Sequence, residues 1–207
     1  MTAPTTIHRT DPLPAFPNPS KDRAIRATLD AWRDAAEAVA ADQWRRFFEK
    51  GRFEQNLPAN AEAAVPAIRR AKQRIGAERL QMVRYQVVGT LRSFLANRQN
   101  DFRRCVERSS LDDATKHQLH TVNRRQAWFD PRDVAMPDGT AVLADARKLG
   151  RRIMRHVLSR HRRPSFKNAN MVVDQRQAVL GRAQTATTYD YWLRLGTVDQ
   201  GKVNVPL

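Results

Sequence analysis

The sequence predicts an α+β protein, with a mostly α-helical region followed by a small, incomplete antiparallel β-barrel or sheet. Apolar residues recur at helical spacing through most of the chain. After Pro164 this pattern gives way to short runs of β-branched and aromatic residues separated by turn residues. Five prolines among the first 20 residues favour an extended start. We therefore expect three regions: an extended N-terminal segment at 1–19, a helical region at 20–160 and a β region at 161–207.

Two interpretations of the structure of the N-terminal segment remain open. Residues 5–10 have the composition of a short strand, and a flexible tail is the alternative. Ser20 is a favourable N-cap for the helix that follows, and Gly51 is a favourable helix end, so the first helix is expected at 20–50. The large aromatic residues of this helix are predicted to be core rather than base-stacking groups: Trp32, Trp44, Phe47 and Phe48.

The next helical stretch begins near residue 64, with Pro66 in its first turn. It continues to about Val106 as one long helix, or as two helices with a break near Gly76. Arginines cover its polar face with few acids among them, which is compatible with a solvated surface or with one that follows phosphates. Ser110 is predicted to cap a shorter helix that runs to about Trp128.

The most basic part of the chain lies between residues 145 and 167, where nine Arg or Lys accompany one acid, Asp145. We expect a helix here with Val142, Ala146, Leu149, Ile153 and Val157 turned inward, followed by a basic linker. So dense a positive charge favours a polyanionic partner. The candidate nucleic-acid-binding residues are Arg147, Lys148, Arg151, Arg152, Arg155, Arg160, Arg162, Arg163 and Lys167.

Short strands are predicted in the last region, at Phe166, 171–173, 178–180, 189–195 and 203–205, with a hairpin loop at 197–202. Tyr189, Tyr191 and Trp192 on one of these strands could stack on bases, but packing on the sheet is the favoured interpretation.

The composition restricts the class of partner and the cellular setting. The 207-residue chain has a formal net charge of +16, and 30 of its 37 basic residues are Arg, which binds phosphate bidentately. Cys105 is the single cysteine, which excludes an internal disulfide or a cysteine-based zinc site and fits a cytoplasmic location. There is no signal-peptide pattern and no apolar run long enough for a membrane span.

Residues with catalytic potential are scarce. The neighbouring carboxylates Asp112 and Asp113 are explained by a helix start, and no other acids converge as a two-metal nuclease requires. The histidine pairs 117/120 and 156/161 are interpreted as solvent-facing rather than as zinc ligands. The sequence contains no glycine-rich phosphate loop. We therefore expect no catalytic residue, no metal and no small-molecule substrate in this chain.

The C-terminal third resembles one known family. Arg162-Arg163-Pro164-Ser165-Phe166-Lys167, followed by an extended segment at 171–174, resembles the "RxP-x-FK" region of TnpB proteins. The segment 189–193, and Gly201-Lys202 with Pro206-Leu207, resemble the family's next strand and its "GKxxxxPL" strand. These proteins are OrfB-type, transposon-encoded, RNA-guided nucleases of bacteria, related to type V CRISPR effectors. The resemblance implies that the helical stretch is the inserted recognition region and that the strands belong to the wedge region.

The resemblance also implies what this chain lacks. In the family, a RuvC-like nuclease domain with three catalytic acids and a zinc-binding cysteine cluster follows the "PL" strand, and none of its residues has a counterpart here. Mg²⁺ and structural Zn²⁺ would belong to that absent part. The resemblance therefore implies a non-catalytic, nucleic-acid-binding portion that holds guide RNA and target DNA, as a fragment, a truncated gene or a functional remnant.

Other functions remain open from the residues alone. The first is a guide-independent helical DNA-binding regulator or transposon accessory protein. The second is an active nuclease, and the shortage of clustered acids argues against it. The third is a structural RNA-binding protein of ribosomal type, and the long hydrophobic helices argue against it.

Overall fold

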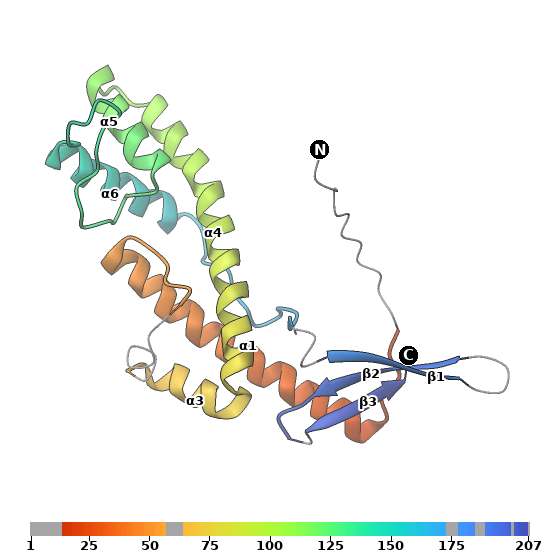
Figure 1. Cartoon of the computed structure of the whole chain (residues 1–207). Coiled ribbons are helices and arrows are strands. Elements are labelled where there is room, and N and C mark those ends of the chain that lie inside the picture. Colours follow the sequence, from red (N-terminus) through yellow and green to blue (C-terminus); the bar gives the residue numbers. More distant parts are fainter. Residues whose placement is uncertain (1–13, 57–63, 173–177, 185–188, 200, 207) are drawn as a thin grey trace, which may run out of the picture. The chain divides into compact units, whose positions relative to one another are not determined.

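The computed structural model describes residues 14–56, 64–172, 178–184, 189–199 and 201–206, which form two compact units. The helical unit comprises residues 31–172, and the sheet unit combines residues up to Asp30 with residues after Val172. Mostly helical secondary structure followed by a small antiparallel sheet confirms the predicted α+β class (Figure 1). The elements are α1 (Pro19–Lys50), α3 (Pro66–Ile75), α4 (Ala77–Glu107), α5 (Asp113–Arg124), α6 (Ala144–Ser159), β1 (Ala178–Gln184), β2 (Tyr189–Gly196) and β3 (Lys202–Pro206).

Two helix starts differ from the predicted caps. The side chain of Asn18, not Ser20, accepts the Lys21 N–H at 3.0 Å, and Pro19 occupies the first helical position. Asp112, not Ser110, caps α5 and accepts the Thr115 N–H at 2.8 Å. A carboxylate has the advantage there because its charge also interacts with the positive end of the helix dipole.

The helix ends at glycines follow the sequence pattern. Gly51 has a φ of 73°, donates its N–H to the Phe47 carbonyl at 2.9 Å and ends α1 at the predicted place. Gly76, with a φ of 83°, separates α3 from α4, so the two-helix alternative is confirmed. Both glycines adopt a left-handed backbone conformation that costs other residues free energy.

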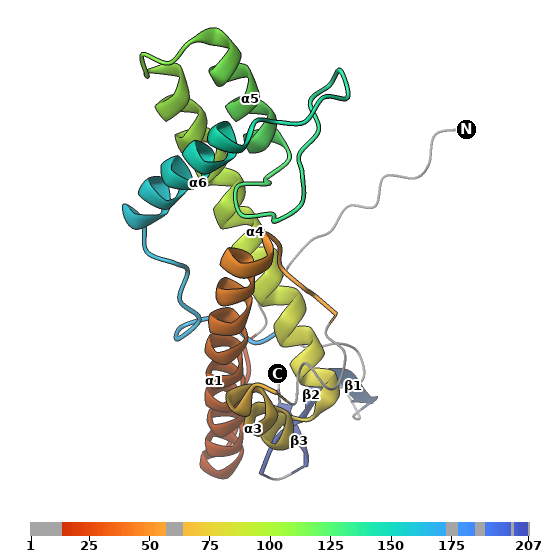
Figure 2. The same ribbon diagram turned by 90° about the vertical axis from the view of Figure 1, so that its left-hand side faces the viewer.

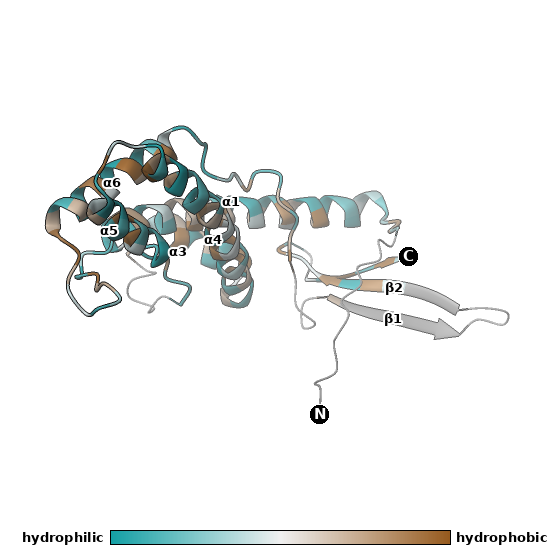
Figure 3. Ribbon diagram, turned by 90° about the horizontal axis from the view of Figure 1, so that it is seen from above, coloured by the Kyte–Doolittle hydropathy of each residue, from teal (hydrophilic) through white to brown (hydrophobic). Residues whose placement is uncertain are grey.

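The core of the helical unit forms around aromatic side chains. The Phe47 ring centroid lies 5.2 Å from that of Phe129 and 6.4 Å from that of Trp128. Trp32 and Phe47 are buried, and Trp44 and Phe48 pack against the same cluster, which confirms their assignment to the core. Helices α1, α3 and α4 lie side by side in the lower part of Figure 2. Polar and apolar residues alternate around the helices, as expected when each buries one face (Figure 3).

Helix α6 buries a slightly different face from the predicted one. Ala146 and Val157 are buried as expected, but Leu149 and Ile153 are only partly buried. Gly150 and Met154 take the central positions. A Cβ on Gly150 would lie 3.5 Å from Leu119, so glycine at this position brings the backbone of α6 close to α5.

The sheet unit contains an antiparallel sheet with the order β1-β2-β3, which is open across its described strands. In β3, buried Val203 and Val205 alternate with exposed residues, and these two valines pair with Leu195 and Leu193 of β2. The Phe16 N–H donates to the Pro206 carbonyl at 2.9 Å, which attaches the chain's extended start to β3. Val198 N–H donates to the Thr28 hydroxyl at 3.1 Å, so the hairpin also contacts the first part of α1.

Two predicted strands do not form. Phe166 lies in a turn, where its carbonyl accepts the Ala169 N–H at 3.1 Å, and Met171–Val172 has no regular structure. No strand forms at Phe166 because its backbone N–H donates to the carboxylate of Glu37. The predicted strand at 5–10, Val173 and the side chains of Tyr189 and Tyr191 lie outside the described residues, whereas Trp192 is half-buried.

Candidate nucleic-acid interface

The exposed side of α6 carries a cluster of cationic side chains, which we call the α6 basic face: Lys148, Arg151, Arg152 and Arg155. Lys148, Arg152 and Arg155 are exposed, and Arg151 is partly buried at the edge of this face. Lys148 lies 3.3 Å from Asp145, but both side chains are largely exposed, so this ion pair contributes little stability. Among the described residues, Arg151 and Arg152 form no ion pair. The α6 basic face therefore offers guanidinium groups that are free to bind an anion.

Arg155 is oriented by an aromatic ring. Its guanidinium carbon lies 5.8 Å from the centroid of Phe129, within the range of a cation–π contact. Because the residue is exposed, its donors remain accessible to solvent. The contact restrains the side chain without neutralising its charge.

Arg147 departs from the predicted role. Its side chain is only 15% exposed and forms an ion pair with Asp133 at 2.7 Å. It also donates to the carbonyls of Asp130, Pro131 and Arg132 at 3.0, 3.2 and 2.8 Å. With its donors occupied in this way, Arg147 holds the loop before α6 and is not placed to bind phosphate.

The basic linker after α6 is fixed to α1 by one carboxylate. Glu37 accepts hydrogen bonds from the Arg163 guanidinium at 2.9 Å, the Ser165 hydroxyl at 2.8 Å and the Phe166 N–H at 2.5 Å. Farther along, Gln86 of α4 donates to the Asn170 carbonyl at 3.0 Å. Arg163 is therefore a structural anchor, whereas Arg160, Arg162 and Lys167 remain exposed.

Burial alone would raise the pKa of Glu37. The N–H of Phe166, the hydroxyl of Ser165 and the positive charges of Arg163 and Lys167 outweigh that effect, and the net pKa is lowered. A lowered pKa in the folded state means that this carboxylate stabilises the fold above its unfolded pKa. That contribution is lost as the pH falls through the folded pKa.

Replacing Glu37 with Gln is expected to lower the free energy of unfolding by about 1–2 kcal/mol at neutral pH, because charge-assisted hydrogen bonds become neutral ones. Urea denaturation of the full chain measures the loss. The difference from the wild-type protein should shrink below about pH 4.5, the ordinary value for this carboxyl.

Glu49→Gln is the matched control, since Glu49 pairs with Arg45 at 2.7 Å but is half exposed. This substitution should lower the free energy of unfolding by less than about 1 kcal/mol. Equal losses at positions 37 and 49 would contradict the anchoring role of Glu37.

A concave surface lies where α4 and α6 end. Its volume is about 410 Å³, and we call it the basic groove; its lining residues are Asp101, Arg104, Cys105, Arg108, His156, Val157, Arg160 and His161. Asp101 approaches Arg104 at 3.6 Å and His161 at 3.5 Å. Among the described residues, Arg108 and Arg160 form no ion pair. The groove is therefore positively charged and joins the α6 basic face to the linker.

Sequence reasoning missed Arg104 and Arg108 as partners of Arg160. Their four-residue spacing at the end of α4, with Arg108 as its C-cap, was the available signal, because it places both on one side of the helix. The sequence does not show that the end of α4 lies close to the end of α6, because this proximity depends on how the helices pack.

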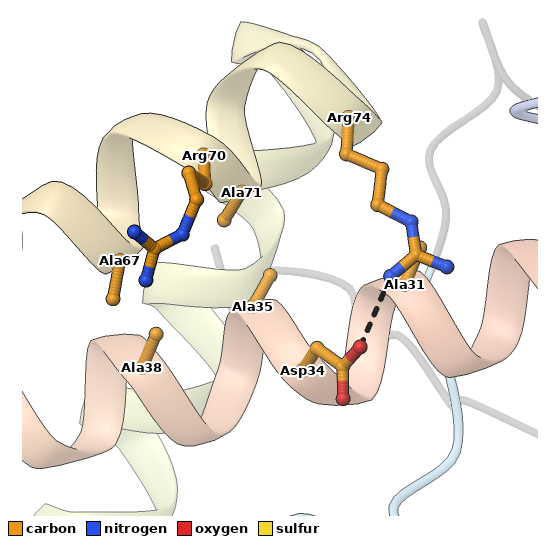
Figure 4. Close-up of a pocket in the computed structure, with 8 residues that line it drawn as sticks. All are labelled: Ala31, Asp34, Ala35, Ala38, Ala67, Arg70, Ala71 and Arg74. Atoms are coloured by element: carbon orange, nitrogen blue, oxygen red, sulfur yellow. Dashed lines mark hydrogen bonds and ion pairs between the residues drawn. The ribbon is translucent and has the colours of Figure 1, made fainter.

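A second groove, between α1 and α3, has a different character. Figure 4 shows alanines of the two helices facing one another, with Arg74 paired to Asp34 at 3.0 Å. The polar lining residues are Asp34 and Arg74, which pair with each other, and Arg70, so we assign this groove no ligand.

In the part of the chain that the structure describes, no three His, Cys, Asp or Glu side chains come together in a way that could hold a metal ion. His117 and His120 are not joined by further ligands, and Asp112 serves as a helix cap. No described helix combines the length and apolar character that a membrane crossing requires. The exposed arginines of α6 and of the linker are the described groups that can donate hydrogen bonds to an anion.

A scan against protein-family models, a search of curated proteins and a search of solved structures each found no match to this chain.

Proposed function

We propose that this chain is the nucleic-acid-binding portion of a TnpB-like, transposon-encoded RNA-guided DNA endonuclease. In this role it holds guide RNA and target DNA in the cytoplasm and does not itself cut. The observation that carries the proposal is the order of the two units. A helical unit, residues 31–172, interrupts a sheet unit made from both ends of the chain. This order resembles a recognition region inserted into a wedge region.

The charge distribution supports a phosphate-binding role. The α6 basic face, the basic groove and the exposed linker residues Arg160, Arg162 and Lys167 are continuous along α6 and the residues after it. Arginine binds phosphate oxygens through paired N–H donors, and such contacts position a nucleic acid without reading its sequence. In RNA-guided systems base pairing reads the sequence, so a surface that holds the backbone is the required property.

Fluorescence anisotropy with the purified full chain tests the proposal. A structured RNA and an RNA–DNA heteroduplex are expected to bind at least about tenfold more tightly than duplex DNA of equal length, a difference of about 1.4 kcal/mol. Preference for one duplex DNA sequence over others would instead favour the guide-independent DNA-binding regulator. Absence of binding to every nucleic acid would reject both functions.

A further inference from the structure

The helical unit has another positively charged concavity, which we call the arginine pocket. It lies beside the end of α1, the middle of α4 and the end of α5, and its volume is about 250 Å³. Phe53 contributes partly exposed apolar surface to its lining, whereas Phe47 and Leu95, which also line it, are almost fully buried. The cationic residues that line it are Arg52, Arg92, Arg125 and Arg132. The pocket therefore combines one partly exposed aromatic ring with several guanidinium groups.

One carboxylate neutralises only part of this charge. Asp130 accepts from the Arg132 side chain at 2.7 and 3.0 Å. The hydrogen bond from Arg132 lowers the pKa of Asp130, burial opposes this effect, and the charge of Arg52 adds to the lowering. Both carboxylate oxygens of Asp130 thus accept hydrogen bonds from Arg132.

The other two arginines have no anionic partner among the described residues. Within this part of the chain, Arg92 approaches the Gln55 side-chain oxygen at 3.5 Å, which is the outer limit of a hydrogen bond. Arg125 makes no side-chain hydrogen bond or ion pair among the described residues. Two guanidinium groups that line one concave surface without a counter-charge favour an external anion.

Two tight backbone turns fix the pocket in place. A Cβ on Gly51 would overlap the backbone N and Cα of Asp130, so the two segments are in direct contact. At the end of α5, Gln126 has a positive φ of 53°, and the Ala127 N–H reaches back to the Val122 carbonyl at 3.0 Å. The Gln126 side chain also donates to that of Gln99 at 3.0 Å. Arg52 and Arg125 each adjoin one of these turns, so the backbone that carries them is ordered before any ligand arrives.

We propose that the arginine pocket binds one nucleoside phosphate, with the phosphate on Arg92 and Arg125 and the base against the partly exposed ring of Phe53. The volume of about 250 Å³ lies just below the usual range of small-molecule sites, which begins at about 300 Å³, so the occupant is small. A single nucleotide suits this space, and a folded polynucleotide does not. The nucleotide is either free or the phosphorylated end of a strand, and the chemistry recognised is the same.

The test uses the full chain and titrates AMP, adenosine and inorganic phosphate by calorimetry. If the ligand is a free nucleotide, the proposal predicts that AMP binds more tightly than either component alone. Replacing Arg92 and Arg125 together with Ala should weaken AMP binding at least tenfold. The matched control replaces Arg69 and Arg70, which are exposed on α3 and form no ion pair in the described part of the chain. This control removes the same charge and should leave AMP binding unchanged.

The source of the nucleotide is resolved with two oligonucleotides that differ only in a 5′-phosphate. A preference for the phosphorylated strand that disappears in the Arg92/Arg125 variant, without AMP binding, supports a strand end. AMP binding with no such preference supports a free nucleotide. The proposal is overturned if neither AMP nor the 5′-phosphate contributes to binding, or if the pocket variant binds both as the wild-type protein does. Thermal denaturation verifies that the variants are folded.

Discussion

Replacing Arg152, Arg160 and Arg162 together with Ala is expected to weaken RNA binding by about 100-fold at low salt. All three side chains are exposed, and they follow the path from α6 through the basic groove to the linker. The expected loss corresponds to about 0.9 kcal/mol for each guanidinium, a modest value for a contact with phosphate. Filter binding with one structured RNA measures it.

The control must remove the same charge from another place. Arg23, Arg69 and Arg70 are exposed and form no ion pair among the described residues, so their replacement with Ala lowers the net charge equally. A general electrostatic attraction would weaken binding equally in both variants. A local interface predicts at least about tenfold weaker binding for the first variant than for the second, which is about 1.4 kcal/mol.

Replacing Gly51 with Ala is expected to lower the free energy of unfolding by about 3 kcal/mol or more. A left-handed conformation costs a residue with a side chain about 1–2 kcal/mol, and overlap in a packed region adds roughly 1–3 kcal/mol. At Gly51 both costs apply, because φ is 73° and the new Cβ would lie only 2.7 Å from the Phe129 carbonyl carbon. Urea denaturation measures the change.

Gly139→Ala separates the two costs. Gly139 also has a positive φ, 86°, but a Cβ there would meet nothing within 4 Å. The Gly139→Ala substitution should therefore lower the free energy of unfolding by only the conformational cost of about 1–2 kcal/mol. Similar losses at the two glycines would show that Gly51 and Asp130 are not in the close contact from which the arginine pocket is inferred.

Local sequence signals predicted the helices well. Gly51 and Gly76 marked helix ends because only glycine adopts a left-handed backbone conformation without cost, and apolar spacing identified the buried faces. The two predicted caps were wrong, because Asn18 and Asp112 lie close to serines that could serve the same purpose. A choice between neighbouring polar residues depends on local geometry that composition does not specify.

The individual roles of the arginines could not be predicted in the same way. Arg147 and Arg151 have equivalent places in the helical pattern, yet Arg147 turns toward Asp133 and three carbonyls. Arg163 is bound by Glu37, which lies 126 residues earlier in the chain. These pairings follow from tertiary packing, so a run of basic residues indicated an anionic partner without showing which side chains were free to bind it.

The salt dependence of RNA binding by the wild-type chain tests the central claim most directly. If exposed arginines hold the phosphate backbone, the logarithm of the binding constant should fall linearly with the logarithm of salt concentration. Each single-strand phosphate contact contributes a slope of about −0.7, so three or more contacts predict a slope steeper than about −2. The variant at positions 152, 160 and 162 should have a slope shallower by about 2. A wild-type slope near zero, or an unchanged slope in that variant, would contradict the account.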